Sequence, residues 1–214
     1  MKSGLETYLR LAPNLCRDGH DIKEVAEKLV EKIECPNQRA HRLFEFVRDE
    51  VAYTMKFQLR SIEDLSGNTA LNARKGFCIQ KATLLASLGR AVGIPTQVCF
   101  QDIINHDLDP ELSAYLGNVL APHGLCSFYL DGKWVKLDPT YPKNTCLQSG
   151  WRVAEFDSEK GALLPAKKLD GSLHITITRD WGCYPDIPEI VYKAIIESFW
   201  YKDLYHFWEI LDRC

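Results

Sequence analysis

One cysteine stands where the chain could make it a nucleophile. It ends the segment Arg74–Cys78, just after Gly76, and the apolar spacing that follows predicts a buried helix from about Cys78 to Val92. In the first turn of a helix, unpaired N–H groups and the helix dipole favour the thiolate, and two cations lie three and four residues upstream. Gly76 allows the close backbone approach that an oxyanion site made of N–H groups requires. The alternative is a buried structural cysteine at a helix start.

A histidine and an aspartate are predicted to meet on a β-hairpin. Asp131-Gly132 separates the runs Gly124–Leu130 and Lys133–Asp138, and this dipeptide is a strong signal for a two-residue hairpin turn. Extending the register of that turn makes His123 and Asp138 diagonal neighbours on one face, roughly 7–8 Å apart at the backbone. We therefore expect Asp138 to accept a hydrogen bond from Nδ1–H of His123.

These three residue types are the parts of a thiol-based catalytic site. Cys78 is the expected nucleophile, His123 the general base and acid, and Asp138 the group that orients the imidazole. The other face of the hairpin is expected to be core, because it carries only apolar side chains: Cys126, Phe128, Leu130, Val135 and Leu137.

The elements that position these residues follow a simple order along the chain. Helical spacing predicts helices at Asp21–Lys32, capped by Asp18 or Asp21, and at Gln38–Val51, and Gly93 ends the helix that begins at Cys78. The remaining predicted elements are a turn at Ser66–Asn68, a strand at Ile94–Ile103, a strand at Leu173–Thr178 with His174 on its polar side, and an aromatic-rich helix from Glu189 to about Leu211. Helices followed by antiparallel strands indicate an α+β fold.

At this point the chain resembles the transglutaminase-like superfamily, whose core is a papain-like α+β fold. The segments that carry the resemblance are Gly76-Phe77-Cys78, Leu88–Pro95, His123 and Asp131–Thr140, with the lead-in Leu43–Val47 and Tyr53. Gly93-Ile94-Pro95 and Asp138-Pro139-Thr140 are its most specific parts. The resemblance implies a Cys78, His123, Asp138 triad. It also implies a single domain over residues 1–214, with a core at about 20–145, an insertion at 102–122, and a C-terminal strand and aromatic helix at 166–214.

The chain departs from the family pattern near the histidine. Leu125 stands where family members often carry an aromatic residue. The insertion 102–122 contains a short predicted helix, Pro110–Leu116, and is expected to form a lid or one wall of the site. Three glutamines, Gln58, Gln80 and Gln97, are candidates for the side chain that completes the oxyanion site. Only the backbone N–H of Cys78 is assigned as an oxyanion donor.

Three classes of function remain open on this sequence. Hydrolysis of an amide or peptide bond through an acyl-enzyme is favoured, given the small size of the chain. Acyl transfer to an amine, as in a transglutaminase or amide synthase, would use the same intermediate, and a non-catalytic binding domain would need no triad. The segment Arg74–Cys78 also resembles arylamine N-acetyltransferases, but Gly93-Ile94-Pro95 and Asp138-Pro139-Thr140 fit the transglutaminase-like pattern better. The expected substrate is a peptide, or a small amide or thioester.

The composition of the chain argues against some classes of binding partner. With 26 basic and 29 acidic side chains, the net charge of −3 argues against a nucleic-acid protein. No run approaches about 18 apolar residues and no signal peptide is evident, so we expect no membrane partner and a soluble cytoplasmic protein.

The eight cysteines form no CxxC pair, so no metal-ligand spacing is present, and most are expected to be reduced. Cys99 and Cys126 lie in apolar stretches and are expected to be small core residues. No EF-hand loop is present, so calcium is not expected, and no other cofactor is indicated.

Two further features have a functional and a structural interpretation. His106 lies in the insertion and could touch substrate, although a solvated loop position is the simpler interpretation. The aromatic segment Phe199–Trp208 is the strongest candidate for a homodimer interface, with packing on its own core as the alternative.

Overall fold

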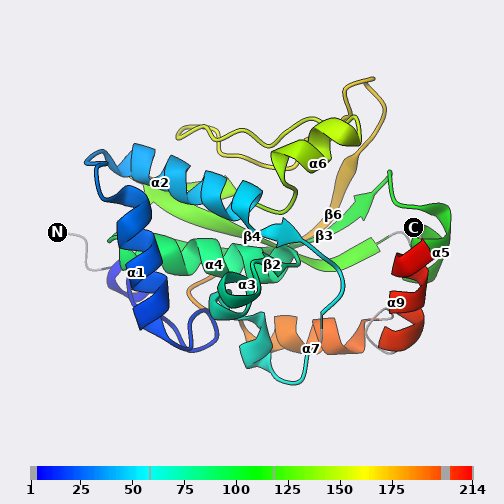
Figure 1. Ribbon diagram of the computed structural model, residues 1–214, viewed down its shortest axis with the longest axis horizontal. Helices are drawn as coiled ribbons and strands as arrows, with labels where there is room; N and C mark the ends of the chain where they lie inside the picture. Colours follow the sequence, from blue (N-terminus) through cyan, green and yellow to red (C-terminus); the bar gives the residue numbers. More distant parts are fainter. Residues whose placement is uncertain (1–3, 58, 118, 199–202, 214) are drawn as a thin grey trace.

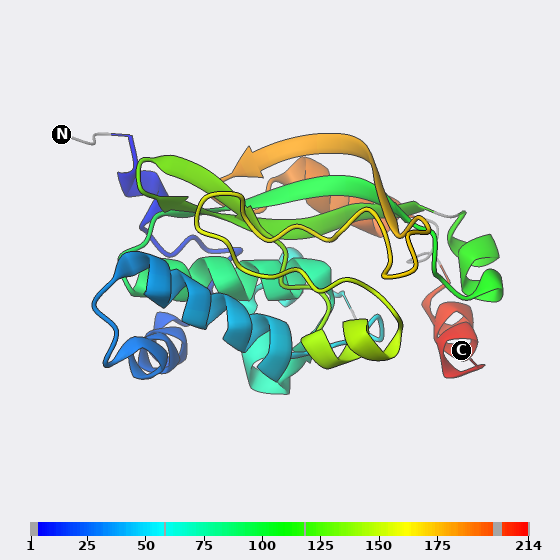
Figure 2. The same ribbon diagram turned by 90° about the horizontal axis from the view of Figure 1, so that it is seen from above.

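A four-stranded antiparallel sheet forms the centre of the computed structural model, which describes residues 4–57, 59–117, 119–198 and 203–213. The strand order is β5-β4-β3-β6, and the strands are β3 (Thr96–Asn105), β4 (Val119–Leu130), β5 (Lys133–Leu137) and β6 (Ile175–Tyr184). Figure 2 shows α4 as a middle layer between this sheet and the helices α1 and α2. The α+β architecture predicted from the sequence is confirmed.

The remaining elements surround this centre (Figure 1). The helices are η1 (Glu6–Tyr8), α1 (Gly19–Val30), α2 (Pro36–Glu45), the π-helical η2 (Phe46–Glu50), η3 (Ile62–Leu65), α3 (Gly67–Ala73), α4 (Cys78–Ala91), α5 (Pro110–Leu116), α6 (Lys143–Gln148), α7 (Glu189–Glu197) and α9 (Leu204–Arg213). Two short parallel strands, β1 (Ala52–Tyr53) and β2 (Lys75–Gly76), pair just before α4.

Local chemistry accounts for the start of α1 and the end of α4, whereas the helix predicted at Gln38–Val51 is α2 (Pro36–Glu45) followed by η2 (Phe46–Glu50). The carboxylate of Asp18 accepts a hydrogen bond from the backbone of His20 at 2.9 Å, which caps α1 as expected. Helix α4 is buried along nearly its whole length, from Cys78 to Arg90, so it is a core helix rather than a surface one. Gly93 follows it with φ of +80°, the left-handed conformation that ends a helix.

The predicted hairpin is present in the predicted register. Leu130 pairs with Lys133, and the ladder continues to the pair Cys126 and Leu137. Asp131 and Gly132 both have positive φ, as a two-residue turn of this twist requires. The five apolar side chains expected to face the core are all at most 3% exposed.

The predicted turn at Ser66–Asn68 is wrong, because Gly67 begins α3. A Cβ on Gly67 would lie 2.6 Å from Cα of Leu84, so this glycine is where α3 packs directly on the backbone of α4. Close helix packing, rather than a chain reversal, explains the glycine.

The burial predicted for the strand at Leu173–Thr178 is correct for Ile175, which is 6% exposed, and for the exposed Thr176 and Thr178, but it is wrong for His174, Leu173 and Ile177. His174 is 1% exposed, whereas Leu173 and Ile177 are 54% and 49% exposed. Strand β6 lies at the edge of the sheet beside β3, and the His174 ring packs on Trp151 at 4.5 Å between centroids. The alternation in the sequence therefore did not reveal that His174 would be covered or that Leu173 and Ile177 would be exposed.

Cys99 is a fully buried core residue as expected, but it is not reduced. Cys99 of β3 stands opposite Cys183 of β6 and forms a disulfide with it, with an S–S distance of 2.05 Å. The two residues are 84 positions apart, so only the strand order brings them together. Cys126 is a fully buried free thiol, as predicted.

The final helix, expected to be continuous from Glu189 to Leu211, is described as α7 and α9, and residues 199–202 of the predicted interface segment lie outside the described residues. Within the described ranges, none of the helices has the length and apolar character that crossing a membrane would require.

Candidate active site

Cys78 is the first residue of α4, and its side chain is buried except for a small opening (8% exposed). Gln80 holds this helix start in place. Its Oε1 accepts from the backbone of Phe77 at 3.3 Å, and its Nε2 donates to the carbonyl of Asp64 at 2.8 Å. A Cβ on Gly76, two residues before the thiol, would lie 3.1 Å from the Gln80 side chain, so a larger residue there would have to push Gln80 aside by a few tenths of an ångström.

Gly124 brings strand β4 against the first turn of α4. A Cβ there would lie 2.7 Å from Cγ1 and 2.8 Å from Cα of Ile79, closer than real side chains come. Because only glycine permits this approach, the neighbouring His123 is held close to the helix start that carries Cys78. The sequence pattern did not single out Gly124, although a glycine inside a strand is a known sign of close backbone approach.

His123 lies between the other two predicted site residues. Its Nε2 is 2.6 Å from Oδ2 of Asp138, and both side chains are nearly fully buried. The expectation that Nδ1 would face the carboxylate is therefore wrong. Since Nε2 faces Asp138, Nδ1 is left for the hydrogen bond that His123 makes with Cys78. The structure thus brings Cys78, His123 and Asp138 together, with His123 hydrogen bonded to both of the others.

The charges of Asp138 and Cys78 alter the titration of the imidazole. Burial alone would lower the pKa of His123, but the charges of Asp138 and Cys78 and the hydrogen bonds to both outweigh it and raise the pKa to about 10. The ring is then protonated at neutral pH and lies hydrogen bonded to Cys78. Arg74, expected to add positive charge, has its guanidinium over the ring of Phe46 at 5.5 Å from the centroid.

A buried lysine, which the sequence pattern did not single out, supports the aspartate segment. Lys81 lies one turn after Cys78, and its ammonium donates to the carbonyls of Arg48, Val51 and Thr140 at 3.1, 2.7 and 2.9 Å. Burial lowers the pKa of Lys81 to about 7. Asp138 itself accepts from the backbone of Thr140 at 3.1 Å, so helix α4 anchors both the thiol and the carboxylate segment. The sequence feature that could have identified Lys81 is the presence of a lysine in the first turn of a helix predicted to be buried.

A small apolar cavity of about 20 Å³ opens beside the thiol. Its walls come from three segments that converge on Cys78: Tyr53, Met55 and Phe57; Phe77; and Leu120, Ala121 and Pro122. The last three residues belong to the end of the insertion 102–122, which therefore supplies one wall of the site. The predicted short helix at Pro110–Leu116 within the insertion is present as α5.

The structure leaves fewer candidates for the side chain that completes the oxyanion site. Gln80 is committed to the helix start, and Gln97 stands opposite Ser127, further along the sheet than Gln101, which faces His123. Gln58 lies outside the described residues. The backbone N–H of Cys78 stays the assigned donor.

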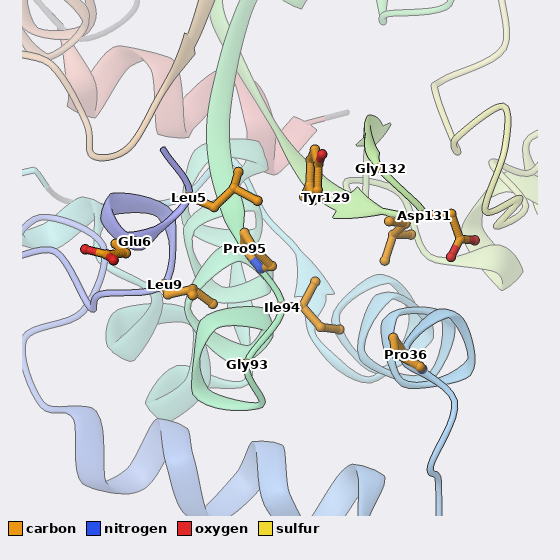
Figure 3. Close-up of a pocket in the computed structure, with 11 residues that line it drawn as sticks. Leu5, Glu6, Leu9, Pro36, Gly93, Ile94, Pro95, Tyr129, Asp131 and Gly132 are labelled. Atoms are coloured by element: carbon orange, nitrogen blue, oxygen red, sulfur yellow. The ribbon is translucent and has the colours of Figure 1, made fainter. Parts of the chain in front are cut away.

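Two other features lie apart from this site. A larger cavity of about 440 Å³ lies at the opposite end of α4, beside Gly93 and the hairpin turn (Figure 3). The described residues that line it include no cysteine, histidine or lysine, and Asp131 there already accepts from Asn37 at 2.7 Å. His106 is exposed and bonded to Thr176 at 2.9 Å, in agreement with the solvated position.

Among the described residues, no three side chains of the metal-ligating types are grouped as an ion would need.

Cys78 is expected to react with iodoacetamide before the other cysteines near pH 7, because the imidazolium of His123 stabilises its thiolate. Peptide mapping after brief labelling measures this. The critical comparison is with Cys35, an exposed free thiol.

His123→Ala is the matched variant, and it should slow labelling of Cys78 while leaving Cys35 unchanged. Uniform labelling, or faster labelling of Cys35 or Cys214 (the latter outside the described residues), would contradict an activated thiol at position 78.

Comparisons with known proteins show what the chain is similar to. A family model described as the transglutaminase-like superfamily matches residues 23–139, a range that contains the thiol, the histidine and the aspartate. A solved structure of a candidate cysteine protease from Cytophaga hutchinsonii matches 87% of this chain at 17% identity, with a TM-score of 0.57. The chain covers 48% of that protein, about half of its length. The match to the periplasmic domain of TgpA from Pseudomonas aeruginosa covers 62% of this chain and 45% of the TgpA chain, at 23% identity and a TM-score of 0.44. The comparison with curated proteins found no match.

Proposed function

The chain belongs to the transglutaminase-like superfamily, and we propose that it performs cysteine-dependent acyl chemistry on an amide or peptide bond, with hydrolysis as the favoured outcome. The observation that carries the proposal is the position of His123, hydrogen bonded to Asp138 on one side and to Cys78 on the other. A binding domain would have no need for a buried thiol, imidazole and carboxylate in contact.

In the first half of the proposed reaction, the Cys78 thiolate attacks the carbonyl carbon and a C–S bond forms. The oxyanion that develops lies at the start of α4, where the backbone N–H of Cys78 and the helix dipole stabilise negative charge. The imidazolium of His123 gives its proton to the leaving nitrogen as the C–N bond breaks. An amine departs and a thioester remains on Cys78.

In the second half, water or an amine attacks the thioester while neutral His123 accepts its proton. The C–S bond breaks and the thiolate returns, again paired with the imidazolium. Asp138 accepts a hydrogen bond from the ring throughout, which holds the ring in one orientation and stabilises its charged form. Water gives a carboxylic acid, whereas an amine gives a new amide, so the three residues serve both hydrolysis and transfer.

The competition between water and amine separates these two outcomes. We expect added hydroxylamine to divert product to the hydroxamate in linear proportion to its concentration, because both nucleophiles meet one acyl-enzyme. Product ratio against hydroxylamine concentration is the measurement, with p-nitrophenyl butyrate as the acyl donor.

Saturation at low millimolar amine, with little hydrolysis in its absence, would overturn the preference for hydrolysis in favour of acyl transfer. If no ester acylates the wild type and Cys78→Ala behaves identically, the binding-domain alternative is favoured. A transferase outcome would include the arylamine N-acetyltransferase-like reaction, which an arylamine acceptor would reveal.

A peptide, or a small amide or thioester, is the proposed substrate. The cytoplasmic location expected from the sequence stays a prediction, and the Cys99–Cys183 disulfide weighs against it because disulfides persist in oxidising compartments. The homodimer also stays a prediction. Phe207 and Ile210 of α9 are buried within the chain itself, and the ring of Phe207 packs on Tyr115 of α5 at 5.9 Å, which uses part of the aromatic face.

A further inference from the structure

The walls beside the Cys78 thiol are built from aromatic and aliphatic side chains. The rings of Phe57 and Phe77 stack in parallel, with centroids 3.9 Å apart and an interplanar angle of 6°. Both are at most 9% exposed, so they form a fixed surface rather than a mobile one. Phe77 directly precedes Cys78 in the chain, which places this surface next to the reacting sulfur.

The remaining wall residues come from chain segments far from Phe77 in sequence. Parallel pairing of Tyr53 with Gly76, and a hydrogen bond from the backbone of Thr54 to the Gly76 carbonyl at 3.0 Å, lay the 53–57 segment along the approach to the thiol. Leu120, Ala121 and Pro122 close the other side, immediately before His123.

The described side chains that line this cavity include no lysine, arginine, histidine, aspartate or glutamate, and the polar members are Cys78 and Tyr53. Burial raises the pKa of Tyr53 well above its ordinary value, so the phenol is neutral, and its hydroxyl is already hydrogen bonded to Tyr141. The cation of the 53–57 segment, Lys56, is exposed and paired with Asp212 of α9.

From these walls we infer that the acyl group loaded onto Cys78 is apolar and uncharged next to its reacting carbonyl. This inference rests on the proposed function and specifies its substrate class. A charged group would lose its hydration on entering and would find no counterion among the described wall residues, whereas an alkyl chain gains contact with the two stacked rings. The cavity holds about one water molecule, so the entering group must be slender or must displace Met55, the flexible wall residue.

Three p-nitrophenyl esters with the same four-carbon acyl chain test the inference: the neutral butyrate, the anionic succinate half-ester, and the cationic 4-(trimethylammonio)butyrate. In each case the thiolate forms the C–S bond as p-nitrophenolate leaves. Rates of acylation by wild type are divided by the rate of each ester with glutathione, which removes differences in intrinsic reactivity. We expect the butyrate to exceed both charged esters by at least about 10-fold.

Variants at Met55 shift the preference in opposite directions. Met55→Lys should raise the succinate-to-butyrate ratio, and Met55→Glu should raise the ratio of the cationic ester to butyrate. Leu147→Lys is the matched control, because Leu147 is 54% exposed on α6 and lines no part of the described cavity wall; it should leave the ratios unchanged. Iodoacetamide labelling of Cys78 reports whether each variant keeps the site intact.

The outcomes separate the inference from the function on which it rests. Equal corrected rates for the three esters, or a preference for a charged one, would overturn the inference while acylation of Cys78 still supported the proposed function. Absence of acylation above the level of Cys78→Ala would overturn both.

Discussion

Replacing Cys78 with alanine is expected to remove acylation of the protein and to lower turnover of an ester or amide by about 10³-fold or more, because the sulfur that forms the thioester is gone. Intact-mass measurement after mixing with p-nitrophenyl butyrate detects the acyl group directly. Steady-state release of p-nitrophenolate measures the loss of turnover. The small side chain of alanine fits the start of α4 without strain, so the fold should persist.

Cys35→Ala is the matched control for this prediction. Cys35 is a free and exposed thiol just before α2, so its loss removes one reactive sulfur without touching the site. That variant should be acylated and turn over like the wild type. If Cys78→Ala retained acylation while Cys35→Ala lost it, the nucleophile would lie outside the proposed site.

Asp138→Asn is expected to leave the fold intact and to lower activity by about 10²–10⁴-fold. An amide keeps the shape of the carboxylate and can still accept from the backbone of Thr140, but it carries no charge to stabilise the imidazolium of His123. It can also donate to Nε2 and hold the ring in the wrong tautomer for the Nδ1 contact with Cys78. Relative kcat/KM for the butyrate ester, together with thermal unfolding, separates loss of chemistry from loss of fold.

The same variant has a distinct pH signature. In the wild type, the raised pKa keeps His123 protonated until pH rises through about 10, so the imidazolium–thiolate pair should persist through neutral pH and be lost above that value. Without the carboxylate, burial lowers the imidazole pKa and the alkaline limb of the pH–rate profile should move to lower pH. A profile identical to that of the wild type would show that Asp138 does not act on His123.

Asp157→Asn provides the control for this change. Asp157 accepts backbone hydrogen bonds from Glu159 and Lys160 in an exposed turn, and an asparagine oxygen can keep them. It should therefore show wild-type activity and an unchanged pH profile. Equal losses in the two variants would remove Asp138 from the catalytic arrangement.

Several features of the site depend on short-range chemistry and were predictable from the residues alone. The Asp131-Gly132 turn and the alternation on either side determine the hairpin register, and that register is enough to place His123 and Asp138 on one face. The apolar spacing after Cys78 and the glycine at position 93 likewise mark both ends of α4. In each case the deciding interactions lie within a few residues of one another.

Other features depend on what packs against each element, and only the tertiary structure decided them. Gly124 matters because Ile79 lies across from it, and the His123 ring nitrogen that faces Asp138 is Nε2 rather than Nδ1. His174 is buried because Trp151 covers it, and Cys99 is bonded because β6 lies beside β3. A period of two or of 3.6 residues reveals which side chains share a face, but not which distant segment will cover that face. The packing of the whole core determines which segment covers each face. The local sequence pattern carries no information about that packing.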